Sequence, residues 1–291
     1  MQRLLATLGA LSLILAACTG GPGASPGGGA GATDGGAGTA PSFPADSTMA
    51  EIQQEGKLVC GVKFDVIAFG FMNPTNNEVE GFDADLCREI ATGLGVEPEF
   101  VETVSANRIP FLQEDKVDIV ISTMTINEER KQEIDFSHEY YHAGQSILVM
   151  SDNAEIQSVD DLDGTTVCTV EGSTSEKNVR EQAPGAELLL FKSYSEAAQA
   201  LVDGRCESVS TDDSILFGLA SQFEGTELRG EPFSDEPLGI GVKKGKDDLV
   251  QFINGVLEDM GDDGRWTALY DKHIKPYSGK DAPEPPFKSG G

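Results

Sequence analysis

Short apolar runs alternate with amphipathic stretches over most of the chain after residue 56. One such stretch places Leu86, Ile90 and Leu94 at i, i+4 and i+8, which is the spacing of one face of a helix. In this first part the pattern predicts strands at 58–62, 99–102 and 117–121, a helix that opens at 81–86 and a helix at 109–112. Strands that alternate with helices in this way predict a parallel β-sheet with crossover helices.

The same alternation is repeated with different residues later in the chain. Strands are predicted at 147–150, 166–170, 188–191 and 207–211, with helices after Gly172 and over 195–202. A further strand at 238–242 is followed by helical spacing of apolar residues over 249–260. We therefore predict an α/β fold built from two such units.

The segment after the strand 117–121 contains one unusual choice of residue. Asn127 is placed to cap a helix, and Glu128 and Glu129 lie in its first turn, where the helix dipole favours anions. Arg130 lies in the same turn, where a cation loses about 0.3–1 kcal/mol to the dipole. A nearby anion would explain its position. Both a bound ligand and a neighbouring acidic side chain fit that requirement, since the chain has 49 Asp and Glu residues.

Composition and charge exclude several classes of function. The chain has 291 residues, of which 39% are apolar, enough for two lobes with real cores. A net charge of −28 argues against nucleic-acid binding, which needs a dominant basic surface. The sequence has no Gly-x-Ser-x-Gly, His-Glu-x-x-His or Walker motif. It also has only three histidines and no Cys-x-x-Cys pair, which argues against a zinc site. We therefore predict no reaction, no cofactor and no metal.

The first 18 residues have the pattern of a lipoprotein signal peptide. Arg3 precedes an apolar run of about a dozen residues, too short to span a bilayer, which needs ~20. Small residues at Ala16 and Ala17 then lead to Cys18. We predict cleavage after residue 17 and lipidation of Cys18, which would anchor the protein outside the cytoplasm. An uncleaved anchor and secretion without lipid are the alternatives.

Two segments are too poor in bulky apolar residues to fold by themselves. Residues 18–48 are mostly Gly, Ala, Pro, Ser and Thr, which predicts a flexible tether spanning about 30 Å. Residues 278–291 are rich in Pro and Gly, which predicts a disordered tail.

Residues 122–141 resemble the strand–helix signature of the amino-acid-binding proteins of ABC importers, which are family 3 extracellular solute-binding proteins. The matching residues are Thr123, Thr125, Arg130, Asp135-Phe136-Ser137 and Tyr140-Tyr141. The resemblance extends over roughly residues 57–277 and also includes the segments 81–86, 107–113, 161–164, 172–174 and 211–213. It is therefore specific as a combination, although each segment alone is a weak signal.

The resemblance implies the two-lobed periplasmic-binding-protein type II fold. Two α/β lobes are joined by two crossing strands, expected near 142–145 and 237–240, with a ligand cleft between the lobes. Lobe 1 would comprise residues 49–142 and 240–277, and lobe 2 residues 143–239. The protein would work as a monomer.

The resemblance also implies roles for individual residues. Arg130 would hold the α-carboxylate of an amino acid together with Thr123 and Thr125, and the backbone N–H of Thr174 would grip the same carboxylate from the other lobe. Asp212 would accept hydrogen bonds from the α-ammonium group. Without the resemblance, both the 172–175 segment and an aspartate at the end of a strand fit ordinary helix caps.

The resemblance implies that Arg108 would set the specificity for the ligand's side chain. The segments 61–65 and 107–110 are most similar to the glutamate- and aspartate-binding branch, in which the arginine at the Arg108 position faces the ligand's side-chain carboxylate. Lys63 would be a second cation. The chain departs from that branch at 66–68, and a surface arginine that pairs locally is the alternative for Arg108.

Four cysteines follow Cys18 and allow three pairings. Disulfides persist outside the cell, and the resemblance supports a bond between Cys168 and Cys206. Cys60 and Cys87, on a predicted strand and the helix that packs over it, either form a second bond or stay as two buried thiols.

These observations predict an extracytoplasmic, membrane-anchored lipoprotein that binds a polar amino acid, most of all glutamate, and delivers it to an ABC permease. A dehydratase-type enzyme and an amino-acid sensor use the same fold and are the alternatives.

Overall fold

The computed structural model describes residues 41–288, so the predicted signal peptide, lipidated Cys18 and most of the predicted tether lie outside the described residues. Within the described part of the chain, no helix is long and apolar enough to cross a membrane. Both predicted α/β units are present in these residues, each with its own five-stranded sheet.

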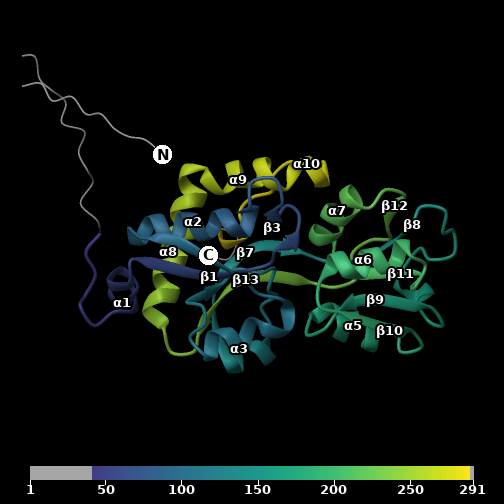
Figure 1. The fold of residues 1–291 in the computed structure, drawn as a ribbon, viewed down its shortest axis with the longest axis horizontal. Helices are drawn as coiled ribbons and strands as arrows, with labels where there is room; N and C mark the ends of the chain where they lie inside the picture. The colour runs from purple at the N-terminus through teal and green to yellow at the C-terminus, as the bar shows by residue number, and fades with distance from the viewer. Residues whose placement is uncertain (1–40, 289–291) are drawn as a thin grey trace, which may run out of the picture. The chain divides into compact units, whose positions relative to one another are not determined.

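The first sheet has the strand order β5-β1-β6-β13-β7. Its strands are β1 (Lys57–Val62), β5 (Glu97–Glu102), β6 (Ile119–Val120), β7 (Ile134–Ala143) and β13 (Glu236–Lys243). The strands β1, β5 and β6 are parallel, whereas β13 runs antiparallel to both of its neighbours. The helices of this part are α1 (Thr48–Glu55), α2 (Phe82–Leu94), α3 (Arg108–Gln113), α4 (Glu128–Glu133), α8 (Asp247–Asp263), α9 (Arg265–His273) and α10 (Lys275–Ser278). Figure 1 shows α2 and α9 on one face of this sheet and α3 on the other.

The second sheet has the strand order β10-β9-β11-β8-β12. Its strands are β8 (Gln145–Met150), β9 (Thr166–Val170), β10 (Glu187–Phe191), β11 (Ser208–Asp212) and β12 (Thr226–Arg229). The helices α5 (Thr174–Gln182), α6 (Tyr194–Val202) and α7 (Asp213–Gln222) pack around it (Figure 1). A small antiparallel sheet consists of β2 (Asp65–Val66), β3 (Gly70–Asn73) and β4 (Glu78–Glu80).

The chain crosses between the two sheets twice. It leaves the first sheet where β7 continues through Gly144 into β8. A Cβ atom at Gly144 would lie 2.6 Å from the Cβ atom of Pro232, so glycine lets the two crossing segments approach each other closely. The returning chain runs beside the outgoing chain, because Glu236 pairs with Ala143 and Pro237 pairs with His142. The segments predicted to cross, near 142–145 and 237–240, are therefore neighbours at this point.

Burial of the predicted apolar faces accounts for the cores of both units. Leu86, Ile90 and Leu94 are fully buried, as their helical spacing predicted. Two disulfides strengthen this packing, Cys60–Cys87 between β1 and α2 and Cys168–Cys206 between β9 and the segment before β11, with Cα–Cα distances of 6.4 and 6.0 Å.

Both ends of the described chain pack onto the first unit. Phe43 lies edge-on to Phe252 at a centroid distance of 5.4 Å, and Ser47 caps α1, so packing begins inside the predicted tether. At the other end, the predicted disordered tail is wrong for residues 278–288. Phe287 lies edge-on to Trp266 at 6.5 Å in a short 3-10 helix, Pro286–Lys288. One large aromatic side chain supplies the buried surface that the Pro- and Gly-rich composition concealed.

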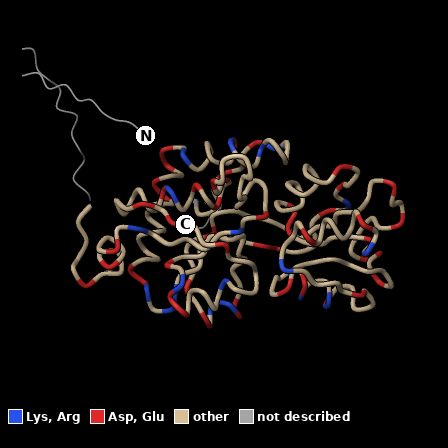
Figure 2. The backbone as a smooth tube through the Cα atoms, in the orientation of Figure 1, with Lys and Arg blue, Asp and Glu red and all other residues tan. Residues whose placement is uncertain are grey.

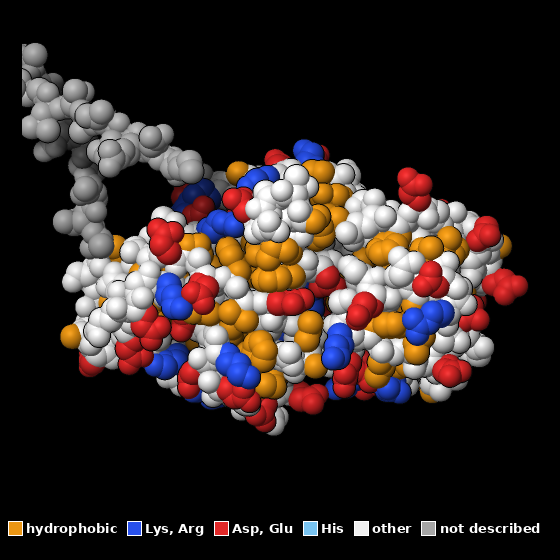
Figure 3. Space-filling view, viewed as in Figure 1, with side chains coloured by type: hydrophobic (Ala, Val, Ile, Leu, Met, Phe, Trp, Pro, Cys, Tyr) orange, Lys and Arg blue, Asp and Glu red, His pale blue; other side chains and the backbone are white. Residues whose placement is uncertain are grey.

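Charged residues of both signs are interspersed along the backbone of both units (Figure 2). Figure 3 shows acidic and basic side chains beside one another on the visible face. On this face, charges of one sign are therefore not gathered in a single field.

Candidate functional site

Arg130 is held at the first turn of α4, close to the segment that links the two sheets. Asn127 caps the helix, because its side-chain oxygen accepts a hydrogen bond of 2.9 Å from the Arg130 N–H. The Arg130 side chain is buried, with 8% of the residue exposed, and its Nη1 donates to the Thr125 carbonyl at 2.7 Å. No acidic side chain among residues 41–288 forms an ion pair with it. Burial lowers the pKa of Arg130, while the negative charges of Glu236 and Asp212 oppose that change.

The two predicted threonines lie in the loop between β6 and α4. The Thr125 hydroxyl donates to Glu236 Oε2 at 2.6 Å and lies 3.2 Å from the Thr174 hydroxyl. Thr123 has a positive φ of 42°, and its N–H donates to Asp83 Oδ2 at 3.0 Å. The buried Thr123 hydroxyl forms no hydrogen bond with any residue that the structure describes. It is therefore available to a ligand.

Arg108 is buried and is not the surface residue of the alternative interpretation. Its Nε donates to the Ser105 carbonyl at 3.1 Å, and its Nη1 donates to the carbonyls of Ser122 and Thr123 at 3.1 and 3.0 Å. Its Nη2 approaches the Gly172 carbonyl at 3.4 Å. Two of these four contacts therefore tie the guanidinium to the backbone of the loop that carries Thr123.

Lys63 follows β1 and points into the same region. Its Nζ donates to Ser105 Oγ at 3.0 Å and lies 5.3 Å from the centre of the Tyr194 ring. Burial lowers the pKa of Lys63 to about 8, and the positive charge of Arg108 acts in the same direction. The predicted cations Lys63, Arg108 and Arg130 therefore gather within one buried region.

The second sheet contributes the start of α5. Ser173 caps this helix by accepting a hydrogen bond of 3.1 Å from the Glu176 N–H. Thr174 is then the first helical residue. Its N–H has no acceptor within the helix and lies at the positive end of the helix dipole. The Gly172 carbonyl accepts from Nη2 of Arg130 at 3.4 Å, which brings this loop against the first unit. A Cβ atom at Gly172 would lie 2.9 Å from the Ala106 Cα, so only glycine fits this approach.

Asp212 and Asp213 divide two tasks between them. Asp213 Oδ1 accepts hydrogen bonds from the N–H groups of Ser214 and Gly144 at 2.7 and 3.4 Å. Asp212 is the buried last residue of β11, and its side chain bonds no residue of the described chain. Burial raises the pKa of Asp212 well above its usual range, and the charges of Glu236 and Asp213 raise it further. A ligand cation would stabilise its charged form.

Glu236 is a site residue that sequence reasoning missed. Its Oε2 accepts from the hydroxyls of Thr125 and Thr174 at 2.6 and 2.8 Å, and its Oε1 accepts from Asn178 Nδ2 and Ser234 Oγ at 2.8 and 2.7 Å. This buried carboxylate bridges groups from both units. The available signal was an acidic residue directly before Pro237 in a strand that is otherwise apolar.

Asp83 is the second missed acid, although it lies in one of the segments that carry the resemblance. It is fully buried in α2 and accepts hydrogen bonds from the Thr123 N–H at 3.0 Å and the Tyr140 hydroxyl at 2.9 Å. Burial raises the pKa of Asp83 to about 6, against the opposing effect of these hydrogen bonds. Asp83 thereby holds the Thr123 loop in its unusual conformation.

A surface pocket of about 550 Å³ opens at this junction, with Arg130, Gly172 and Thr174 in its wall. Among the buried charged residues, only Arg130 lines this pocket. The cations Lys63 and Arg108 and the acids Asp83, Asp212 and Glu236 lie in the interior, close enough to Arg130 and to one another to shift each other's pKa values. Such an arrangement offers a fixed guanidinium, a free helix N–H and an unpaired carboxylate. It can hold a small molecule that carries both a carboxylate and an ammonium group.

Residues 58–276 match the model of the family described as bacterial extracellular solute-binding proteins, family 3. A glutamine-binding protein of an ABC transporter from Bacillus subtilis is 42% identical over 93% of this chain and 96% of its own length. A glutamine-binding protein from Geobacillus stearothermophilus is 46% identical over 68% of this chain and 77% of its own length. A glutamate-binding protein from Corynebacterium glutamicum is 33% identical over 80% of this chain and 83% of its own length.

Solved structures with the same two-lobed fold agree with these relatives. An ancestral arginine-binding protein bound to glutamine is 42% identical, with a TM-score of 0.72 over 75% of this chain and 98% of its own. An ancestral amino-acid-binding protein, described as a precursor of cyclohexadienyl dehydratase, is 39% identical, with a TM-score of 0.74 over 79% of this chain and 100% of its own.

Proposed function

This chain belongs to the bacterial extracellular solute-binding proteins of family 3, and we propose that it captures glutamine outside the cytoplasm and delivers it to an ABC permease. The proposed ligand is held by both units. The guanidinium of Arg130 and the N–H of Thr174 bind its α-carboxylate, and Asp212 binds its α-ammonium. The hydroxyl of Thr125 binds the same carboxylate after it turns away from Glu236, to which it donates in this structure. Because these groups come from different sheets, a bound ligand would favour the state in which the two units are closed around it.

The balance of buried charges carries the choice of glutamine. Lys63, Arg108 and Arg130 oppose the three acids Asp83, Asp212 and Glu236. A zwitterion with a neutral side chain adds no net charge to this region. A side-chain carboxylate would add one buried negative charge, and an unpaired buried charge is costly. The glutamine-binding relatives at 42% and 46% identity support the same ligand.

Glutamate is the second candidate ligand. A glutamate-binding relative is 33% identical, and Arg108 Nη2 still approaches only the Gly172 carbonyl, at 3.4 Å. In this version Arg108 and Lys63 would turn toward the side-chain carboxylate, as the family resemblance suggested. That arrangement requires Arg108 to give up some of its contacts with backbone carbonyls.

The same proposal includes a lipid anchor at Cys18, a monomeric protein and the absence of catalysis. The dehydratase precursor among the structural neighbours keeps an enzyme as the rival function. A turnover assay with hydroxylated cyclohexadienyl compounds would separate the two, because a binding protein leaves these compounds unchanged.

Titration calorimetry of the wild type with glutamine, glutamate, asparagine and aspartate tests the proposal. Glutamine should bind with one site and should be preferred over glutamate by roughly tenfold, as expected for about 1.4 kcal/mol. Arg130→Ala should abolish measurable binding. Lys131→Ala is the matched control, since Lys131 is an exposed cation on the same helix and pairs only with Glu128 at 2.8 Å. Equal binding by both variants would refute the role of Arg130.

A further inference from the structure

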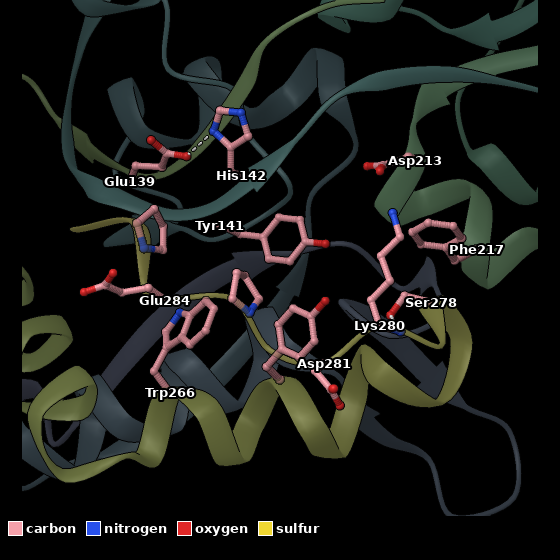
Figure 4. A pocket seen from close by; sticks show the side chains of 13 residues that line it. Glu139, Tyr141, His142, Asp213, Phe217, Trp266, Ser278, Lys280, Asp281 and Glu284 are labelled. Carbon is pink, nitrogen blue, oxygen red and sulfur yellow. Dashed lines mark hydrogen bonds and ion pairs between the residues drawn. The ribbon is translucent and has the colours of Figure 1, made fainter. Parts of the chain in front are cut away.

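A second pocket, of about 480 Å³, is lined by residues that do not belong to the proposed amino-acid site. Its aromatic lining comes from three elements and consists of Tyr141 on β7, Trp266 and Tyr270 on α9, and Phe217 on α7. The segment that begins with Ser278, the last residue of α10, and runs to Pro286 supplies another wall. Figure 4 shows these side chains around a common space. Its volume suits a small organic ligand.

The Tyr141 hydroxyl is an unpaired polar group in this pocket. The ring of Tyr141 stacks on that of Tyr270 at a centroid distance of 6.3 Å, and the residue is only 7% exposed. Its hydroxyl points into the pocket in Figure 4 and bonds no residue in the described part of the chain. This hydroxyl is not among the described polar atoms that are both shut off from water and without a partner. A ligand can therefore reach it and bond to it in exchange for water.

Acidic groups outnumber basic ones around the pocket. Four acids line it, Glu139, Asp213, Asp281 and Glu284, with Lys280 and His142 as the basic residues. His142 is already bound to Glu139 at 2.7 Å. Lys280 lies over the Phe217 ring at 5.6 Å, and its charge acts on Asp213. The chain's own ammonium group therefore lies over an aromatic face of the pocket and within electrostatic reach of Asp213.

We propose that this pocket binds a small organic ammonium compound with an apolar body, such as an arylalkylamine. The apolar body would lie against the faces of Tyr141, Tyr270 and Trp266. The ammonium would bond Asp213 and the Tyr141 hydroxyl, and would displace Lys280 from its place. A free amino acid fits poorly, because its carboxylate would face the surrounding acids. This second site is independent of which amino acid the first site takes.

The direct test is a titration with 2-phenylethylamine, with 2-phenylethanol as the uncharged analogue of the same shape. Trp266 is the single tryptophan of the chain, so its fluorescence reports on this pocket. The amine should bind saturably and at least tenfold more tightly than the alcohol. It should bind equally well to Arg130→Ala, in which the amino-acid site is disabled. Equal affinity for amine and alcohol, or loss of amine binding in Arg130→Ala, would overturn the proposal.

Three variants test the assignment of residues, and they change the affinity in opposite directions. Asp213→Asn should weaken amine binding roughly tenfold, and Tyr141→Phe should weaken it about threefold while keeping the ring. Lys280→Met should tighten amine binding several-fold, because it removes the internal competitor. Lys272→Met is its control, since Lys272 pairs with Asp85 outside the pocket and should change nothing. An unchanged or weaker affinity in Lys280→Met contradicts the assignment, and a misfolded protein cannot produce the expected gain.

Discussion

Two neighbouring aspartates, Asp212 and Asp213, belong to two proposed sites of opposite character. Asp212 belongs to a buried region in which guanidinium groups are fixed by backbone carbonyls, as Arg108 is by Ser122 and Thr123. Asp213 lines a pocket with aromatic walls and an excess of acids. The first arrangement suits a ligand with a carboxylate, and the second suits a cation without one. The chemistry of a carboxylate is therefore set by the groups around it, even between adjacent residues.

The two sites also differ in how they are built. The amino-acid site takes its groups from loops at the ends of strands in both sheets, where open α/β folds usually bind ligands. The second pocket depends on a helix pair and on the segment from Ser278 to Pro286. Equivalent substitutions in the two proposed sites, such as those of Asp212 and Asp213, test whether the sites bind their ligands separately.

The largest expected effect comes from Asp212→Ala compared with Asp213→Ala. Asp212→Ala would leave the ligand's ammonium buried without its counter-charge, which costs about 3–5 kcal/mol and more than hundredfold in affinity. Asp213→Ala should change amino-acid affinity less than about threefold, which is under about 1 kcal/mol. The reason is that the Asp213 carboxylate bonds backbone N–H groups and lines the other pocket. Titration calorimetry with glutamine measures both. Similar losses in the two variants would show that the sites are not separate.

A smaller effect is expected from pH. Burial raises the pKa of Asp212 in the free protein, and the ligand's ammonium would lower it again. Protons therefore compete with the ligand, so affinity should fall as pH is lowered, by up to about tenfold per unit for one proton. Calorimetry between about pH 7 and 5, in two buffers with different ionisation enthalpies, would detect the released proton. Asp213→Asn should keep this dependence on pH. If the dependence were lost in Asp213→Asn, the titrating group would be Asp213 and not Asp212.

The ratio of glutamine to glutamate affinity should respond to the buried charge balance. Glu236→Gln removes one negative charge and should shift the ratio toward glutamate by roughly tenfold, about 1.4 kcal/mol. Arg108→Met removes a positive charge and should shift it toward glutamine. Using the ratio cancels changes that affect both ligands equally. If both variants moved the ratio in the same direction, charge balance would not explain specificity.

The smallest effects concern the two unpaired hydroxyls, of Thr123 and Tyr141. Thr123→Val should weaken glutamine binding by the value of one hydrogen bond, about 0.5–1.5 kcal/mol, and leave 2-phenylethylamine binding unchanged. Tyr141→Phe should do the reverse. Neither variant should lower the thermal stability, because each removes a hydroxyl that has no hydrogen-bond partner in the described chain. A crossed effect on the other ligand would contradict the separation of the sites.

Much of this fold follows from interactions within a turn or two of each residue. The period of Leu86, Ile90 and Leu94 predicted a buried helix face, and Asn127 predicted the start of α4 next to Arg130. The family resemblance added the positions of Thr174 and Asp212. These signals are local because helix periodicity and capping depend on residues three or four apart.

The tertiary structure decided what lies next to these residues. Glu236 meets Thr125 across 111 positions and Thr174 across 62, because the crossing strands bring β13 beside the start of α5. The orientation of Arg108 toward backbone carbonyls and the packing of Phe287 on Trp266 are also long-range contacts. The sequence by itself thus determined the elements and the types of charge near the site. The partner of each charge was decided by the crossings between the sheets, which no local pattern encodes.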